Sequence, residues 1–203
     1  MKLPQEFYQG DDVVAISRAL LGKYLYTCID GAVTGGYIVE TEAYNGVIDR
    51  ASHAFGNRLT PRTKTMFEHG GIAYVYLCYG IHEMFNVVTS VEGQPHAVLI
   101  RAISPTDGLD IMQYRRNMPV IKPTITSGPG SVAKALGISR AINAISLQGD
   151  TIWIEDRGLA FTDDQIAAVP RVGVDYAWED ALLPYRFYIK GNPYVSKPNK
   201  HKS

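Results

Sequence analysis

Two glutamates stand two residues apart in the segment Val39-Glu40-Thr41-Glu42-Ala43-Tyr44, at the end of a predicted strand. Because side chains alternate along a strand, both carboxylates are expected on one face of the sheet. A carboxylate that leaves water needs a partner, so the pair either faces solvent at an exposed strand end or belongs to a site. Positioned carboxylates can act as general bases. The pattern alone leaves both interpretations open.

A second set of candidate residues is aromatic. Tyr74 and Tyr76 share one face of a predicted strand, and Tyr79 ends that strand just before Gly80. An aromatic ring at a strand-to-loop tip is well placed to stack on a base or to wedge into a nucleic acid. Packing on the sheet is the commoner role for any single tyrosine.

The histidines do not match a metal motif. His82-Glu83 begins like a zinc-protease sequence, but Asn86 stands where the second histidine is required. His53 lies in a polar segment with four basic residues, Arg50, Arg58, Arg62 and Lys64. That segment is either a solvated basic surface or a patch that follows phosphates beside a site.

Hydrophobic periodicity predicts a domain rich in strands. We expect strands over 23–29, 36–41, 72–79, 84–90, 96–103, 152–155 and 187–189, helices over 10–22, 105–116 and 131–136, and an extended segment over 118–126. Asp30-Gly31 predicts the turn of the first hairpin, and Gly128-Pro129-Gly130 predicts a turn before a helix. Residues 44–64 predict a long ordered loop, a feature that is usually functional. Without a βαβ rhythm, the pattern favours an α+β domain around a mostly antiparallel sheet.

Composition limits the alternatives. With 203 residues, 46% of them hydrophobic, the chain predicts one globular domain over 1–203, with 192–203 as a flexible tail. Lys plus Arg and Asp plus Glu both number 20, so any binding of nucleic acid must depend on local basic patches. Cys28 and Cys78 are too few for a disulfide framework or a zinc site, which favours an intracellular protein. No apolar run suggests a signal peptide or a membrane span.

Several short blocks, taken together, resemble the alkyladenine (3-methylpurine) DNA glycosylase family. The blocks are 38–44, Ser52-His53, Thr60-Pro61-Arg62, Met66-Phe67, 74–80, Asn86, 99–102, 127–129, 171–174 and 186–188. They follow the order of the family and cover nearly the whole chain, which is far more specific than any one motif. The resemblance implies a single compact domain around a curved, mostly antiparallel sheet with surrounding helices. That domain is similar to the C-terminal barrel of formyltransferases and carries neither metal nor cofactor.

The resemblance also implies roles for individual residues. Glu42 matches the general base, and Arg101 with the main chain of Val172 matches the groups that hold the attacking water. Asn86 matches the residue that excludes guanine by crowding its exocyclic amino group, and Tyr79 matches the side chain inserted into the minor groove. The walls that stack on the flipped base are matched by Tyr44, His53 and Tyr76.

Contacts to the DNA backbone are expected from the basic loop and from the residues after Tyr79. The candidates are Arg50, Arg62, Lys64, Ile81 and His82. Ile81 and His82 depart from the Met and Tyr of the best-known vertebrate members. Because both flank the inserted residue, details of DNA contact and of lesion preference are expected to differ from those members.

The resemblance therefore implies a monofunctional DNA glycosylase acting on alkylated or deaminated purines such as 3-methyladenine, 7-methylguanine, hypoxanthine and ethenoadenine, whereas the residues alone indicate only a hydrolase-like or nucleotide-handling domain. No lysine or N-terminal amine stands in an evident Schiff-base position, so we expect water as nucleophile and no strand cleavage. The expected partner is damaged duplex DNA, bound by a monomer in the bacterial cytoplasm or the eukaryotic nucleus. Two alternatives are a non-catalytic lesion-binding module and a formyltransferase-like accessory domain that binds nucleic acid. The set of Glu42, Tyr79, Asn86 and Arg101 argues against both.

Overall fold

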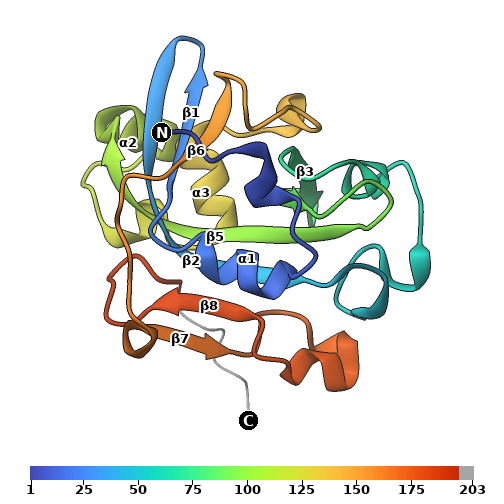
Figure 1. The fold of residues 1–203 in the computed structure, drawn as a ribbon. Coiled ribbons are helices and arrows are strands. Elements are labelled where there is room, and N and C mark those ends of the chain that lie inside the picture. The colour runs from blue at the N-terminus through green and yellow to red at the C-terminus, as the bar shows by residue number, and fades with distance from the viewer. Residues whose placement is uncertain (197–203) are drawn as a thin grey trace.

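Strand pairing is antiparallel throughout residues 1–196, which are the residues that the computed structural model describes. The strands are β1 (Tyr24–Ile29), β2 (Ala32–Tyr44), β3 (Ala73–Cys78), β4 (His82–Thr89), β5 (His96–Asp107), β6 (Ile152–Glu155), β7 (Ile166–Val169) and β8 (Arg186–Ile189). They join in the order β3-β4-β5-β2-β1-β6, and β8, which pairs with β7, also pairs with β2. Figure 1 shows the long, curved β2 and β5 running through the middle of the molecule, with the β7–β8 hairpin to one side.

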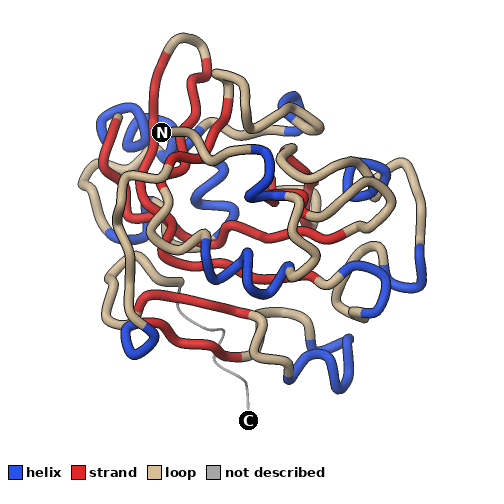
Figure 2. Tube along the Cα trace, in the orientation of Figure 1, coloured by secondary structure: helices blue, strands red, loops and turns tan. Residues whose placement is uncertain are grey.

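Helices and helical turns fill the connections between the strands (Figure 2). The α-helices are α1 (Val13–Ala19), α2 (Leu109–Arg116) and α3 (Pro129–Leu136). Short 3-10 helices are η1 (Gln5–Tyr8), η2 (Gly46–Ile48), η3 (Phe55–Asn57), η4 (Lys64–Phe67), η5 (Pro123–Ile125), η6 (Arg140–Ile142), η7 (Asp163–Gln165) and η8 (Asp175–Leu182). Three of them, η2 to η4, lie in or at the end of the segment predicted as a long ordered loop.

The first hairpin follows from local sequence. Asp30 and Gly31 both have positive φ, 54° and 74°, which is the conformation of the two-residue turn that matches strand twist. The turn sets β1 against the first half of β2, with Tyr24 opposite Tyr37. It therefore leaves the second half of β2 free to pair with β8.

Two irregularities in the β2–β5 pairing decide which way the two glutamates point. Ile38 pairs with Ile103 and Glu40 pairs with Ala102, so β2 carries one extra residue there. Thr41 then pairs with Ile100, which makes Arg101 the extra residue of β5. Each bulge reverses the alternation of side chains along its strand. Ile38 therefore joins the hydrophobic core, while Glu40 and Glu42 belong to the opposite face.

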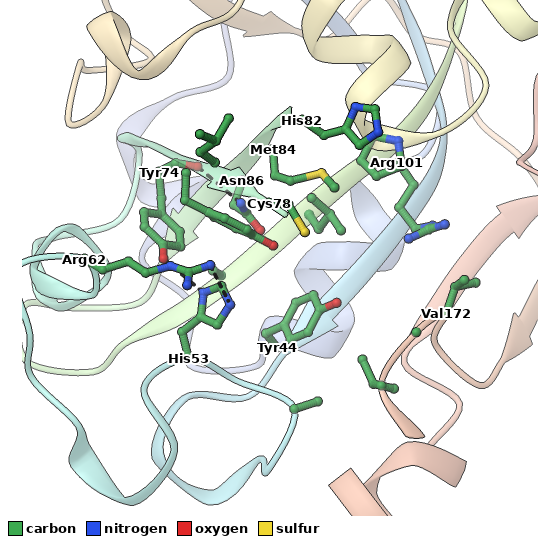
Figure 3. Close-up of a pocket in the computed structure, with 18 of the residues that line it drawn as sticks. Tyr44, His53, Arg62, Tyr74, Cys78, His82, Met84, Asn86, Arg101 and Val172 are labelled. Atoms are coloured by element: carbon green, nitrogen blue, oxygen red, sulfur yellow. Dashed lines mark hydrogen bonds between the residues drawn. The ribbon is translucent and has the colours of Figure 1, made fainter. Parts of the chain in front are cut away.

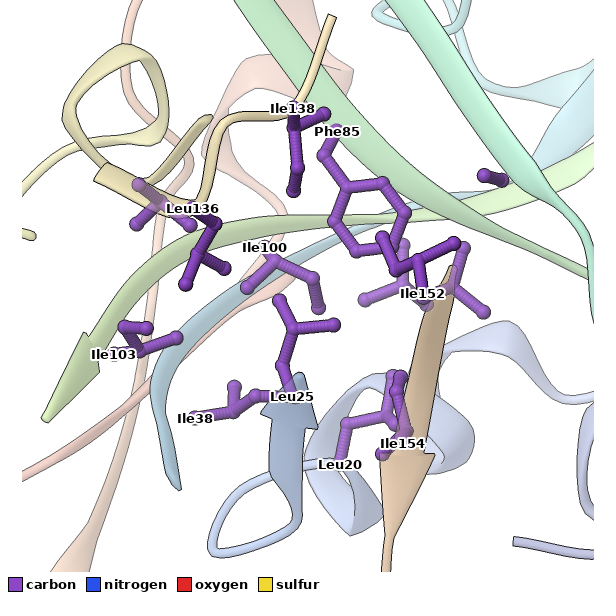
Figure 4. Close-up of a cluster of buried hydrophobic side chains, with 14 of the residues drawn as sticks. Leu20, Leu25, Ile38, Phe85, Ile100, Ile103, Leu136, Ile138, Ile152 and Ile154 are labelled. Atoms are coloured by element: carbon purple, nitrogen blue, oxygen red, sulfur yellow. The ribbon is translucent and has the colours of Figure 1, made fainter. Parts of the chain in front are cut away.

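The hydrophobic core lies on one face of the sheet. Phe85, Ile100 and Leu25 are fully buried there, and Leu20 from the C-cap of α1 and Leu136 from α3 pack on them (Figure 4). The side chain of Asp12 caps α1 by accepting hydrogen bonds from two backbone amides, as expected for an aspartate at a helix N-cap. The core covers one face of β3, β4 and β5 and leaves the other face for a site.

The α+β class and the antiparallel sheet are confirmed. The sequence missed β7, ended the second strand of the hairpin three residues too early, and described 118–126 as extended although η5 lies within it. Within the tail expected over 192–203, Ser196 is buried, and its amide and hydroxyl bind the carboxylate of Glu40. The remainder of that tail, 197–203, lies outside the described residues.

Gly36→Ala should destabilise the fold, because an added Cβ would overlap the backbone of Ser104 and Pro105 at a further register shift of the β2–β5 ladder, between Gly35 and Gly36. We expect a loss of about 1–3 kcal/mol in the free energy of unfolding, measured by urea denaturation. Gly10→Ala is the control, since its Cβ would make an ordinary contact of 3.4 Å with Ile16. Equal stability of the two variants would contradict this account of β2.

Candidate functional site

One face of the sheet lines a cavity of about 640 Å³. Alternate residues of neighbouring strands supply its wall: Tyr44 from β2; Tyr74, Tyr76 and Cys78 from β3; Met84 and Asn86 from β4; Ala97, Leu99 and Arg101 from β5. The loop residues His53 and Arg62 and the segment Val172-Gly173-Val174 complete it. Figure 3 shows these side chains pointing into one space, with Asn86 and Met84 on one side and His53 and Tyr44 on another.

Glu42 is fully buried and is held by three groups that line this cavity. The backbone amide of Val172 donates to Oε1 at 2.8 Å, and Nη1 of Arg101 lies 3.4 Å from the same oxygen. The hydroxyl of Tyr44 donates to Oε2 at 2.9 Å. An ionised carboxylate has about four lone-pair positions, so these three contacts leave one on Oε2 for a further donor.

Two pKa shifts fix the charges around Glu42. Burial raises the pKa of Tyr44 well above its ordinary value, and the negative charge of Glu42 adds to the effect. Tyr44 therefore keeps its proton and donates it. Burial opposes the charge on Arg101, but Glu42 and Glu40 outweigh that effect and raise its pKa. The arginine thus remains a cation between two carboxylates.

Glu40 has a different environment from Glu42. Its Oε1 accepts hydrogen bonds from Arg101 at 3.0 Å and from Arg186 at 2.7 Å. Ser196 adds its hydroxyl to Oε1 at 2.8 Å and its amide to Oε2 at 2.7 Å. Ser196 also accepts a hydrogen bond from Arg101 through the same hydroxyl, at 3.2 Å. Glu40 therefore anchors Arg101, so the two glutamates have separate tasks.

A second buried ion pair positions the segment that carries Val172. Arg171 binds Asp49 with two hydrogen bonds of 2.5 and 2.8 Å, and both side chains are buried. The guanidinium of Arg171 also donates to the carbonyl of Ala43 and lies 4.9 Å from the ring centroid of Tyr44. Because Arg171 precedes Val172, this pair fixes the amide and the tyrosine that both hold Glu42.

The aromatic wall of the cavity is made by His53, Tyr74 and Tyr76. The His53 and Tyr76 rings meet edge to face with centroids 4.7 Å apart, and Tyr74 lies 5.4 Å from Tyr76. Burial lowers the pKa of His53 to about 4, with further contributions from the charges of Arg62 and Arg58. His53 is therefore neutral at pH 7. Asn86 donates to the carbonyl of Tyr74 at 3.2 Å, which fixes its amide beside these rings.

Tyr79 stands at the rim of the cavity. Its side chain is 89% exposed, and both Tyr79 and Gly80 have positive φ, 49° and 73°. For a tyrosine this left-handed conformation is strained, and such strain is often found at functional positions. The β3–β4 turn therefore projects an aromatic ring into solvent beside the opening.

The basic loop forms a second, adjoining cavity of about 390 Å³. Arg50, Arg58 and Arg62 line it together with Thr60, and it shares His53 with the first cavity. Of the backbone-contact candidates, Arg62 and His82 line the first cavity, whereas Lys64 and Ile81 are exposed and line neither. Arg50 forms ion pairs with Glu179 and Asp180.

Comparisons with known proteins identify the family of this chain. Residues 6–193 match the family model described as methylpurine-DNA glycosylase. The chain belongs to this family. A curated relative from Chlamydia felis is 47% identical over 190 residues, covering 92% of this chain and 95% of its own. Relatives from Bacillus cereus (44% identical) and Bacillus mycoides (43%) cover 97% of this chain and all of their own. All three are named "Putative 3-methyladenine DNA glycosylase".

The structure brings together every residue for which the family resemblance implied a catalytic or pocket role. Glu42 contacts both Arg101 and Val172, and Tyr44, His53, Tyr76 and Asn86 line the same cavity. Their chemical roles remain predictions. Sequence reasoning did not assign the partnership of Asp49 with Arg171, the anchoring by Ser196, or the cavity residues Cys78, Met84 and Leu99. Strand alternation from Tyr76 and Asn86 was a signal that could have found Cys78 and Met84.

None of the helices in residues 1–196 is long and apolar enough to cross a membrane. No three or more His, Cys, Asp or Glu side chains in that range gather closely enough to hold a metal ion.

His53 should make the protein less stable in mild acid. Its folded pKa of about 4 lies below the unfolded value of about 6.5, so the unfolded chain binds more protons between these values. The stability that His53 contributes is fully present above about pH 6.5 and is lost as the pH falls towards 4. Urea denaturation between pH 7.5 and 4.5 should show a smaller loss for His53→Gln than for the wild type. His96, whose pKa is also lowered, titrates in both proteins. Identical pH slopes would contradict the assignment.

Proposed function

We propose that this protein is a DNA glycosylase that removes damaged purines from duplex DNA by hydrolysing the N-glycosidic bond. The observation that carries the proposal is the environment of Glu42. Its buried carboxylate lies behind the wall of an aromatic cavity, accepts hydrogen bonds from Tyr44 and Val172, lies 3.4 Å from Arg101, and keeps one acceptor position on Oε2. A water molecule bound at that position would be activated by general-base catalysis.

The proposed reaction uses only water and the lesion. The bond between C1′ of the deoxyribose and N9 of the purine breaks, and its electron pair stays with the purine. The water oxygen forms a bond to C1′ as its proton passes to Glu42, leaving an abasic sugar. Arg101 holds the carboxylate in place through its Nη1 while its Nε is bound to Glu40. Because no lysine is assigned to attack C1′, we expect an intact DNA strand after base release.

The aromatic residues fit the task of flipping a base out of the helix. A base inside a duplex is inaccessible to the enzyme, and extruding it costs a few kcal/mol. Stacking on aromatic rings returns about 1–3 kcal/mol per base, which Tyr44, His53 and Tyr76 would provide. Tyr79, exposed at the rim, would occupy the space that the base leaves in the helix.

The second cavity suits a phosphate of the same strand. Three guanidinium groups and the hydroxyl of Thr60 line it, next to the entrance of the base pocket. Contacts to phosphates position a protein on DNA without reading the sequence. Local charge of this kind explains how a chain with no net charge could bind DNA. We propose that the protein acts as a monomer on alkylated and deaminated purines.

Glu42→Gln should abolish excision while lesion binding persists. The amide keeps the shape of the side chain but loses its basicity, which typically costs about 10²–10⁴-fold in rate. Excision of 7-methylguanine or hypoxanthine from a labelled duplex, followed by alkaline cleavage at the abasic site, measures the rate. A gel-shift titration with the same duplex measures binding. Excision at the wild-type rate would show that a residue other than Glu42 is the general base.

Asn86→Ser should relax discrimination against guanine, because a smaller side chain leaves room for the 2-amino group. The measurement is release of undamaged guanine from G·T mismatches by the variant and the wild type. Hypoxanthine, which lacks that amino group, serves as the control substrate for both enzymes. If guanine release does not rise, another residue excludes guanine.

Tyr79→Ser should slow excision most in a fully paired duplex. There the stacking lost on flipping is greatest, and the inserted ring offsets part of the cost. The same lesion is placed in a matched duplex, a mismatched duplex and a single strand, and single-turnover rates are compared. The deficit should shrink along that series. An equal deficit in all three contexts would contradict the proposal that Tyr79 inserts into the DNA helix.

A further inference from the structure

Arg62 lines the base cavity from its edge, and the residue is exposed to solvent. Its guanidinium carbon is 4.7 Å from the ring centroid of Tyr76, and its Nη2 is 3.2 Å from Nε2 of His53. Figure 3 shows Arg62 reaching past Tyr74 to His53. The guanidinium thus touches two of the three aromatic walls that were assigned to a flipped base.

The hydrogen bond between Arg62 and His53 has a defined direction. A guanidinium only donates, so Nε2 of His53 accepts, and the neutral ring carries its proton on Nδ1. That Nδ1 lies 3.0 Å from the hydroxyl oxygen of Tyr74, to which it donates a hydrogen bond. The low pKa of His53 agrees with this neutral form. The tautomer therefore follows from the presence of Arg62.

Arg62 has donors to spare and no compensating acid. Of its five N–H groups, one is given to His53. Within residues 1–196, no carboxylate forms an ion pair with Arg62. A charged donor without an acid partner is therefore available at the edge of the cavity, where the rim of a bound base would lie.

A guanidinium matches one edge of a purine in particular. Its parallel N–H groups bind O6 and N7 of guanine, the commonest specific arginine contact in the major groove. Hypoxanthine presents the same two acceptors without the 2-amino group that Asn86 is proposed to exclude. A purine methylated at N7 has lost one of these acceptors and carries a positive charge. The guanidinium of Arg62 already lies over the ring of Tyr76, which could attract such a cation.

We propose that Arg62 is a specificity-determining residue that donates to O6 and N7 of the flipped base, so that the pocket prefers neutral 6-oxopurines to N7-alkylated cations. This inference rests on the proposed function. When the glycosidic bond breaks, the electron pair on the departing purine spreads onto N7 and O6. The charge of Arg62 lies against those atoms and stabilises them.

The test compares two lesions in otherwise identical duplexes, hypoxanthine and 7-methylguanine, in single-turnover excision at saturating enzyme. Arg62→Met should slow hypoxanthine release by about 10- to 100-fold, the loss expected for one bidentate contact. Release of 7-methylguanine should be unchanged or faster. Arg62→Lys, which keeps the charge but not the fork, should fall between the wild type and Arg62→Met for hypoxanthine. Arg58→Gln is the charge-matched control, because Arg58 lines only the adjoining cavity, and it should affect both lesions alike.

Binding provides a second measurement that does not depend on turnover. In the Glu42→Gln background, a duplex with 7-deazahypoxanthine should bind more weakly than one with hypoxanthine, because it lacks the N7 acceptor. Adding Arg62→Met should remove that difference.

Equal slowing of both lesions by Arg62→Met, or no slowing of hypoxanthine release, would overturn the inference and leave the proposed function standing. So would a wild type that releases 7-methylguanine but not hypoxanthine. A wild type that releases neither lesion would overturn the proposed function itself.

Discussion

The site depends on one constraint, which is the burial of two negatively charged carboxylates on the same strand, β2. Glu40 and Glu42 are both fully buried, and removing a carboxylate from water costs several kcal/mol unless charged and hydrogen-bonding partners replace the solvent. Arg101 meets this requirement for both at once, since its Nε binds Glu40 and its Nη1 lies against Glu42. Its place in a bulge of β5 allows a single side chain to reach both carboxylates.

The buried charges of the site also balance one another. Three buried acids, Glu40, Glu42 and Asp49, face three buried arginines, Arg101, Arg171 and Arg186. These charges cancel inside the molecule and create little field outside it. Of the arginines that line the second cavity, Arg50 is paired with Glu179 and Asp180, whereas Arg58 and Arg62 form no ion pair within residues 1–196 and remain available to a ligand. Net charge is therefore a poor guide to what this surface binds.

Much of the fold could be predicted because its causes are local. Alternation predicted most of the strands, Asp30-Gly31 predicted the first hairpin, and Gly128-Pro129-Gly130 marked the start of α3. The residues of the site were predicted from the order of the family motifs. Strand alternation alone would not have distinguished them from other residues on the same face. Alternation also predicted one face for Glu40 and Glu42, but it would have added Ile38 to that face. A bulge depends on the partner strand, so its position is not visible in either strand alone.

Contacts between distant segments escaped prediction for a related reason. Asp49 and Arg171 are 122 positions apart, and neither belongs to a recognisable motif with the other. Arg62 appeared as one of several basic residues in a loop, since nothing in the sequence shows that its guanidinium folds onto Tyr76. Ser196 resembled part of a polar tail because its partner, Glu40, lies 156 positions earlier.

That last separation has a consequence for how the protein is made. A ribosome adds about 5–20 residues per second, so about 8–30 s pass between the synthesis of Glu40 and that of Ser196, its partner 156 positions later. During this interval a nascent chain gains Arg101 early but lacks Arg186 and Ser196 until near the end of the interval. Two of the three residues that replace water around Glu40 are therefore made late. The surroundings of Glu40, at the junction of β2, β5 and β8, are complete only when residues 186–196 have been made.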